Sequence, residues 1–253
     1  MPSHWPTDQR FVPPTRFQIT LTPIPQYTGV YPNFTSTTLE SFHLRRLAAL
    51  ASSPRHWACI DVLVFETVPR VDEVSAIRRV VAQLYHEYVV ERKPLWISCV
   101  FPHGRMPGWD LDVESGNSRG DVQMLVEGLL APGGDASVQV EGIGINCIHP
   151  SYLPSLIRDL TREVKTYWTN LEAPRRMLRL LLYPDGGKEW DSIAREFKSG
   201  GVSIDEWTAS VKQAVYLAVD SESGGQVWDE IVVGGCCNTG PEHIRHLAGG
   251  IPV

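Results

Sequence analysis

The fold is decided by the run ACIDVLVF at residues 58–65, which is almost continuously apolar and leads directly into ETVP at residues 66–69. Runs of this kind are typical of a parallel strand that is buried on both faces. A helix is expected next, over residues 71–91. The stretch therefore predicts a strand–helix unit with a carboxylate, Glu66, at the end of its strand.

The same alternation continues on both sides of this unit. Before it, we expect a strand over residues 16–21 and a helix over residues 37–51, which TTLE at residues 37–40 opens with capping-box spacing. After it, we expect strands over residues 95–100, 138–146, 177–182 and 230–233, and helices over residues 121–130, 152–168, 204–219 and from about residue 239. Strands that alternate with helices form a parallel sheet.

The predicted fold is α/β, of the (β/α)8 TIM-barrel type, with about six of the eight strand–helix units of a complete barrel. An open doubly wound sheet would need a glycine fingerprint early in the chain, and the sequence has none. We expect residues 1–14 to form an extended proline-rich arm and residues 15–253 to form one barrel domain.

Composition limits the class of partner. A net charge of −6 argues against a broad phosphate-binding surface, so we expect no nucleic-acid partner. No segment approaches the roughly 18 consecutive apolar residues of a membrane-spanning helix, and the N-terminal residues lack the pattern of a secretory signal. We therefore expect a cytoplasmic protein without a membrane partner, whose five cysteines remain reduced.

Three cysteines follow predicted strands. Cys147 ends the strand over residues 138–146, and Cys236 and Cys237 follow the last strand and a glycine pair. The carboxyl ends of barrel strands share one edge, and three thiolates with one open position form a catalytic zinc site. The alternative is that such cysteines are small buried hydrophobes, which is our interpretation of Cys59 and Cys99 inside apolar strands.

Two carboxylates leave further interpretations open. Glu66 suits either a substrate contact or an ion pair at a strand end, and an unrelated barrel enzyme could use Glu66 and Asp185 for acid–base chemistry. Tyr183 stands in a Tyr-Pro turn that needs no ligand to explain it. Three histidines near the cysteines in sequence are expected on the surface or at helix caps: His149, His243 and His246.

Several motifs resemble those of the homocysteine S-methyltransferase family. The resemblance rests on VVGGCCNTGPEHI at residues 232–244, GINC at 144–147, DVLVFETVP at 61–69, LYPDGG at 182–187 and QYTGVY at 26–31. It extends from about residue 17 to residue 248. The pairing of Gly-Gly-Cys-Cys with a distant Asn-Cys is its most specific part.

The resemblance implies a zinc ion bound by Cys147, Cys236 and Cys237, with Glu66 contacting the amino group of homocysteine. The zinc-bound sulfur would attack the methyl group of a sulfonium donor, S-methylmethionine or S-adenosylmethionine, and give methionine. Two tryptophans in loops are candidates for contacting the donor cation, with packing as the alternative: Trp109 and Trp190.

The chain also departs from the family pattern. Family members begin with an Asp-Gly-Gly strand end and a second strand, so the first strand here corresponds to the third of the family. Open edges are then expected on the first and last strands, and a second copy of the chain could pair there. The alternative function is a zinc- and thiol-binding homologue that has lost turnover and acts as a partner subunit.

Asp185 is a second departure from the family pattern, because the family usually has Asn at this position.

Overall fold

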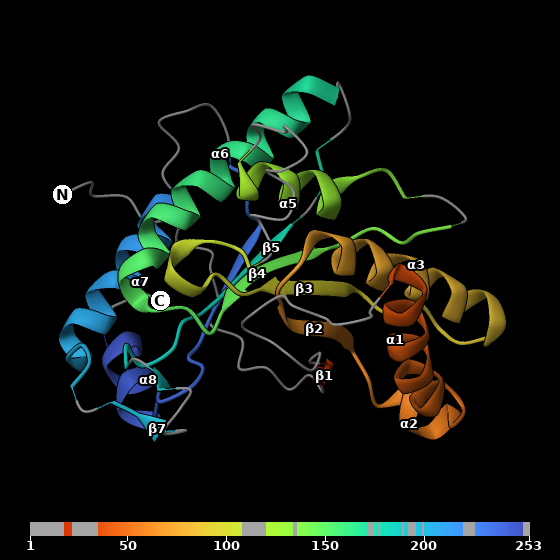
Figure 1. Cartoon of the computed structure of the whole chain (residues 1–253), viewed down its shortest axis with the longest axis horizontal. Helices are drawn as coiled ribbons and strands as arrows, with labels where there is room; N and C mark the ends of the chain where they lie inside the picture. Colours follow the sequence, from red (N-terminus) through yellow and green to blue (C-terminus); the bar gives the residue numbers. More distant parts are fainter. Residues whose placement is uncertain are drawn as a thin grey trace.

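The computed structural model describes residues 18–21, 35–107, 120–133, 136–171, 175–176, 178–188, 190–191, 196–198, 200–219 and 226–249. Its main sheet has six strands in the order β1-β2-β3-β4-β5-β8, and every neighbouring pair is parallel. In Figure 1, α5 and α6 lie above this sheet, α1 to α3 lie at one side and α7 and α8 at the other.

The strands of the main sheet are β1 (Gln18–Leu21), β2 (Val62–Val68), β3 (Leu95–Cys99), β4 (Gly142–Asn146), β5 (Arg179–Tyr183) and β8 (Glu230–Val233). The helices are α1 (Ser36–Ala51), α2 (Pro54–Ala58), α3 (Val71–Glu87), α5 (Asp121–Leu130), α6 (Leu153–Leu171), α7 (Ile204–Val219) and α8 (Pro241–Ala248). Two short 3-10 turns, η1 (Pro102–Gly104) and η2 (Pro150–Tyr152), and a small antiparallel pair, β6 (Trp190–Asp191) with β7 (Glu196–Phe197), complete the described elements.

The strand order confirms the predicted partial barrel. Each strand of the main sheet pairs with the strand next to it in sequence, whereas a doubly wound sheet reverses direction part-way. Within the described residues, β1 and β8 stand at the two ends of the order and have one sheet neighbour each.

The two faces of the sheet have different environments. Leu63, Phe65 and Ile97 belong to the large core that the helices share with the outer face. Val62, Val64, Trp96 and Leu181 form a separate buried cluster, against which Tyr183 and Val232 pack. Because side chains alternate along a strand, this second cluster marks the inner face of the barrel.

The predicted start of β2 was wrong, and so was the assignment of Cys59 to the core. Residues 54–58 form α2, Cys59 is its exposed C-cap, and the strand begins only at Val62. The physical reason is local. The Ser53 side chain caps the helix and Pro54 occupies its first turn, two start signals that prevail over the apolar run. Cys99 is buried in β3, as predicted.

Other boundaries shift by a few residues. The strand expected from residue 138 begins at Gly142, because Val138 hydrogen-bonds the Arg78 carbonyl and guanidinium instead of a neighbouring strand. The helix expected to reach residue 91 ends at Glu87, and α6 continues to Leu171. None of the described helices combines the length and the apolar character that crossing a bilayer requires. The predicted arm over residues 1–14 lies outside the described residues.

Candidate metal centre

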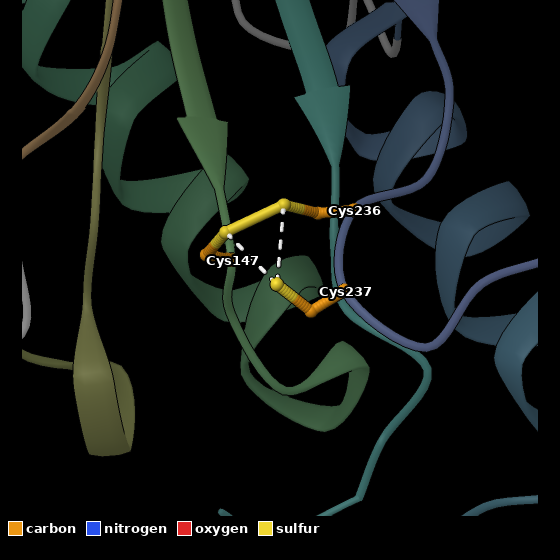
Figure 2. A group of neighbouring side chains, drawn as sticks. All are labelled: Cys147, Cys236 and Cys237. Carbon is orange, nitrogen blue, oxygen red and sulfur yellow. Dashed lines mark hydrogen bonds between the residues drawn. A yellow bond between two sulfur atoms is a disulfide. The ribbon is translucent and has the colours of Figure 1, made fainter. Parts of the chain in front are cut away.

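Three cysteine sulfurs converge at the carboxyl end of the sheet. Cys147 follows β4, and Cys236 and Cys237 lie in the loop after β8, as Figure 2 shows. The Sγ atoms of Cys147 and Cys237 are 3.9 Å apart, and those of Cys236 and Cys237 are 4.0 Å apart. Cys147 and Cys236 form a disulfide contact of 2.50 Å. The structure thus brings together all the thiols that the sequence pointed to.

The donor set fits a thiolate-bound metal. Zinc binds sulfur at about 2.3 Å in a tetrahedral arrangement, which places two sulfurs about 3.8 Å apart. The two distances that involve Cys237 match this spacing. The disulfide between Cys147 and Cys236 must be reduced before both can act as ligands, since a metal binds the thiolate form.

The turn after β5 positions both cysteine loops through its backbone. The Tyr183 carbonyl accepts a hydrogen bond from the Cys147 amide at 3.2 Å. The next carbonyl, of Pro184, accepts one from the Cys236 amide at 2.8 Å. Because β5 lies between β4 and β8 in the sheet, one turn holds both cysteine-bearing segments in register.

Gly186 completes this contact. Its amide donates to the Cys237 carbonyl at 2.7 Å, and a Cβ at this position would collide with the Asn238 backbone. A side chain would therefore push the β5 turn away from the Cys-Cys loop. Sequence reasoning missed this role of the turn. The available signal was the position of LYPDGG between the two cysteine motifs.

Asn146, next to Cys147, ties three strand ends together. Its Oδ1 accepts from the Thr67 amide at 3.0 Å and from the Ser98 hydroxyl at 2.9 Å, while its Nδ2 donates to the Thr67 hydroxyl at 2.8 Å. Thr67 and Cys147 both adopt left-handed backbone, with φ of 57° and 48°, which is uncommon for any residue other than glycine and rarest for a β-branched one such as Thr67. The strand end that carries Glu66 is thereby fixed to the strand end that carries Cys147.

Glu66 lies at this end of β2, on the face of Val62 and Val64, and is half-buried. Its negative charge, together with burial as the larger cause, raises the pKa of Tyr183 well above the usual value. Burial also raises the pKa of Asp185. Two smaller effects lower that pKa: the Gly187 amide donates a hydrogen bond to the carboxylate at 2.7 Å, and the charge of His149 favours the ionised form.

The nearby histidines have structural roles. The His149 side chain accepts from the Ser151 amide and caps η2, and the His243 ring accepts from the Gly240 amide at the start of α8. The exposed His246 lies 3.5 Å from Asp205. These positions confirm the cap and surface roles expected for them. Trp109 and the loop over residues 26–31 lie outside the described residues, and of Trp190 only the backbone, in β6, is described.

A family model described as homocysteine S-methyltransferase matches residues 12–250 of the chain. The chain belongs to this family. The resemblance predicted from the sequence motifs is therefore confirmed.

Two curated relatives give the scale of the similarity. Homocysteine S-methyltransferase 3 of Arabidopsis thaliana is 30% identical over 227 residues, which cover 88% of this chain and 51% of the relative. Selenocysteine Se-methyltransferase of Brassica oleracea var. italica is 27% identical over 224 residues, with 88% and 51% covered. The chain spans about half the length of the curated relatives it matches.

Solved structures of the family agree in fold. The metallated form of the homocysteine methyltransferase MmuM from Escherichia coli superposes with a TM-score of 0.51 at 21% identity, covering 88% of this chain and 55% of that one. The oxidized form of the same enzyme gives a TM-score of 0.53 at 21% identity, with the same coverage. This similarity confirms the partial barrel.

Proposed function

We propose that this chain holds one zinc ion through Cys147, Cys236 and Cys237 and uses it to bind the thiol of homocysteine for methylation to methionine. The observation that carries the proposal is the convergence of three sulfurs, from loops after two different strands, at the carboxyl end of a partial barrel. Membership of the family supports methyl transfer as the reaction class. Because free thiolates are required, a reducing compartment such as the cytoplasm suits the site.

Zinc in such a site lowers the pKa of a bound thiol, so that the substrate sulfur is a thiolate at neutral pH. The residues of the chain orient the rest of the substrate. Glu66 accepts hydrogen bonds from the substrate ammonium group, as a half-buried carboxylate on the inner face of β2 can do. Asn146 holds the distance between this carboxylate and Cys147 through its bonds to Thr67.

The methyl donor in this proposal is a sulfonium compound, S-methylmethionine or S-adenosylmethionine. The substrate sulfur attacks the methyl carbon, the carbon–sulfur bond of the donor breaks, and its electron pair neutralises the sulfonium charge. Two relatives are named for homocysteine and for selenocysteine, which both carry an amino-acid group and a nucleophilic chalcogen. That shared chemistry supports an amino-acid thiol as the acceptor.

A second candidate is a zinc- and thiol-binding homologue without turnover that acts as a partner subunit. The observation that favours it is that β1 and β8 each have one sheet neighbour within the described residues. An edge strand presents unpaired backbone groups, to which a second copy of the chain could add its own strand.

The first test is metal analysis of reduced protein beside two cysteine variants. We expect about one zinc per chain in the wild type and in Cys59→Ala, whose thiol is exposed at the end of α2, far along the chain from the site. Cys236→Ala should lose most of the metal, because two thiolates bind zinc far more weakly than three. Full zinc retention in Cys236→Ala would refute the site.

The second test separates the two candidate functions. The zinc-loaded protein is incubated with homocysteine and each sulfonium donor in turn, and methionine is measured. Methionine formation that depends on Cys236 supports the methyltransferase and identifies the donor. Homocysteine binding without methionine from either donor supports the partner-subunit alternative.

A further inference from the structure

Tyr183 carries a buried hydroxyl that has no hydrogen-bond partner among the described residues. Nearly all buried polar groups in folded proteins have a partner, because an unsatisfied one loses its bonds to water without compensation. Such a group lowers the stability of the fold. It therefore calls for an explanation, and a bound ligand is one.

The position of Tyr183 directs that hydroxyl to the substrate side of the site. The residue is the last one of β5, between β4 and β8, and its backbone carbonyl contacts the Cys147 amide. Its side chain packs on the inner-face cluster of Val64 and Leu181. The ring thus starts beneath the thiols and lies inside the barrel.

The far end of the ring lies close to Glu66. The carboxylate of Glu66 and the hydroxyl of Ser98 lie next to the Tyr183 phenol, but neither meets the geometry of a hydrogen bond to it. Burial, with the Glu66 charge as a smaller cause, raises the pKa of the Tyr183 phenol. Tyr183 spans the interior from the cysteine-bearing strands to the carboxylate-bearing strand.

Other buried polar atoms without a partner lie elsewhere in the described structure. His43 belongs to α1 and Thr208 to α7, on helices outside the sheet. Trp96 faces the barrel interior at the level of Arg179, four residues before Tyr183 along β5, and the Arg179 guanidinium lies 5.7 Å from its ring. In this group, Tyr183 alone stands at the strand ends beside the thiols and Glu66.

We propose that Tyr183 is a substrate-binding residue whose phenolic oxygen accepts a hydrogen bond from the ammonium group of the amino-acid thiol. The Glu66 carboxylate accepts another N–H of the same ammonium. An ammonium offers three donors, so a carboxylate and a phenol together satisfy it better than a carboxylate alone. This assignment rests on the proposed function and names the part of the substrate that the inner face of β5 recognises.

The test compares two thiols that differ only in the amino group. Homocysteine and its deamino analogue, 4-sulfanylbutanoate, are titrated calorimetrically into reduced, zinc-loaded wild type, Tyr183→Phe and Tyr152→Phe, which removes a hydroxyl from an exposed residue. Tyr183→Phe should bind homocysteine about tenfold more weakly, as expected for one lost hydrogen bond to a charged group, and the analogue with unchanged affinity. Tyr152→Phe should match the wild type for both thiols.

The melting temperature separates this role from a purely structural one. If the Tyr183 hydroxyl only stabilised the fold, its removal would lower the melting temperature. Because Phe removes an unsatisfied hydroxyl, the melting temperature of ligand-free Tyr183→Phe should equal or exceed that of the wild type. Unchanged homocysteine affinity, equal losses for both thiols, or a clearly lower melting temperature would overturn the assignment. Zinc-loaded wild type that binds neither thiol would refute the proposed function itself, and with it the assignment.

Discussion

Asp185 is a carboxylate in a place that raises its pKa. Burial is the main cause, and the Gly187 amide and His149 offset it only in part. A raised folded-state pKa means that the folded protein prefers the neutral acid more than the unfolded chain does. The contribution of this residue to stability is therefore present at acid pH and is lost as the pH rises through the folded pKa.

Replacing Asp185 by Asn should consequently stabilise the protein at neutral pH. The amide keeps an oxygen for the Gly187 N–H and carries no charge to desolvate. We expect the melting temperature of reduced, metal-free Asp185→Asn to exceed that of the wild type by a few degrees at pH 7, and the difference to shrink toward pH 4. Asp205→Asn, at a highly exposed carboxylate, is the control. A difference that grows on acidification would contradict the explanation.

The sequence predicted which thiols form the site, but it did not predict the hydrogen bonds that position them. Cys147, Cys236 and Cys237 were identifiable because each follows a predicted strand, and strand ends share one edge in a barrel. The Asn146 bonds to Thr67 and the carbonyl contacts of Tyr183 depend on the register of distant strands. No spacing in the sequence encodes that register, so these contacts became visible only in three dimensions.

Among the elements, the turn that follows β5 has the largest influence on the site. It contacts the backbone on both sides of the thiol cluster, and Gly186 leaves no room there for a side chain. A single methyl group at that position tests whether the turn sets the spacing of the sulfurs.

Gly186→Ala should lower zinc occupancy severalfold while the sheet stays folded, because the added Cβ displaces the loop that carries Cys237. Gly240→Ala is the matched control, since a Cβ there meets no atom within 4 Å. Metal content and far-ultraviolet circular dichroism are measured on both variants. Equal zinc in Gly186→Ala and the wild type would show that the turn does not govern the metal site.

Element boundaries were predicted well where tertiary context agrees with local pattern. The predicted bounds of α5, α7 and β8 coincide with the structure. The errors arose where a local signal competed with hydrophobicity. Ser53 and Pro54 start a helix that extends to Ala58, the first residue of the expected strand. Val138 hydrogen-bonds to Arg78 and is therefore not part of β4.

At the scale of the whole molecule, the unusual feature is that the described sheet ends in two outer strands, β1 and β8. The described residues of β2 to β5 are mostly buried, whereas Ile231 to Val233 in β8 are only half-buried and Glu230 is exposed. A parallel barrel buries its strands on both faces and leaves no edge. Within the part of the chain that the structure describes, β8 therefore has a strand on one side only and is partly exposed.

The reduced, zinc-loaded chain should associate with itself through such edges. In sedimentation velocity over a hundredfold range of concentration, we expect the weight-average mass to rise above the 28.3 kDa of one chain. High salt should leave the association in place, because backbone hydrogen bonds and apolar burial are weakly screened. A mass of 28.3 kDa at every concentration would contradict edge pairing.

The disulfide contact pairs residues separated by 89 positions along the chain. A metal ion that binds the same two sulfurs would cross-link this long stretch and would lower the conformational entropy of the unfolded chain. One of these sulfurs lies just after β8, which is less buried than β2 to β5. Chelation should thus loosen the C-terminal part, β8 and α8, before the rest of the barrel opens, so that metal supply also governs how long the protein survives proteases.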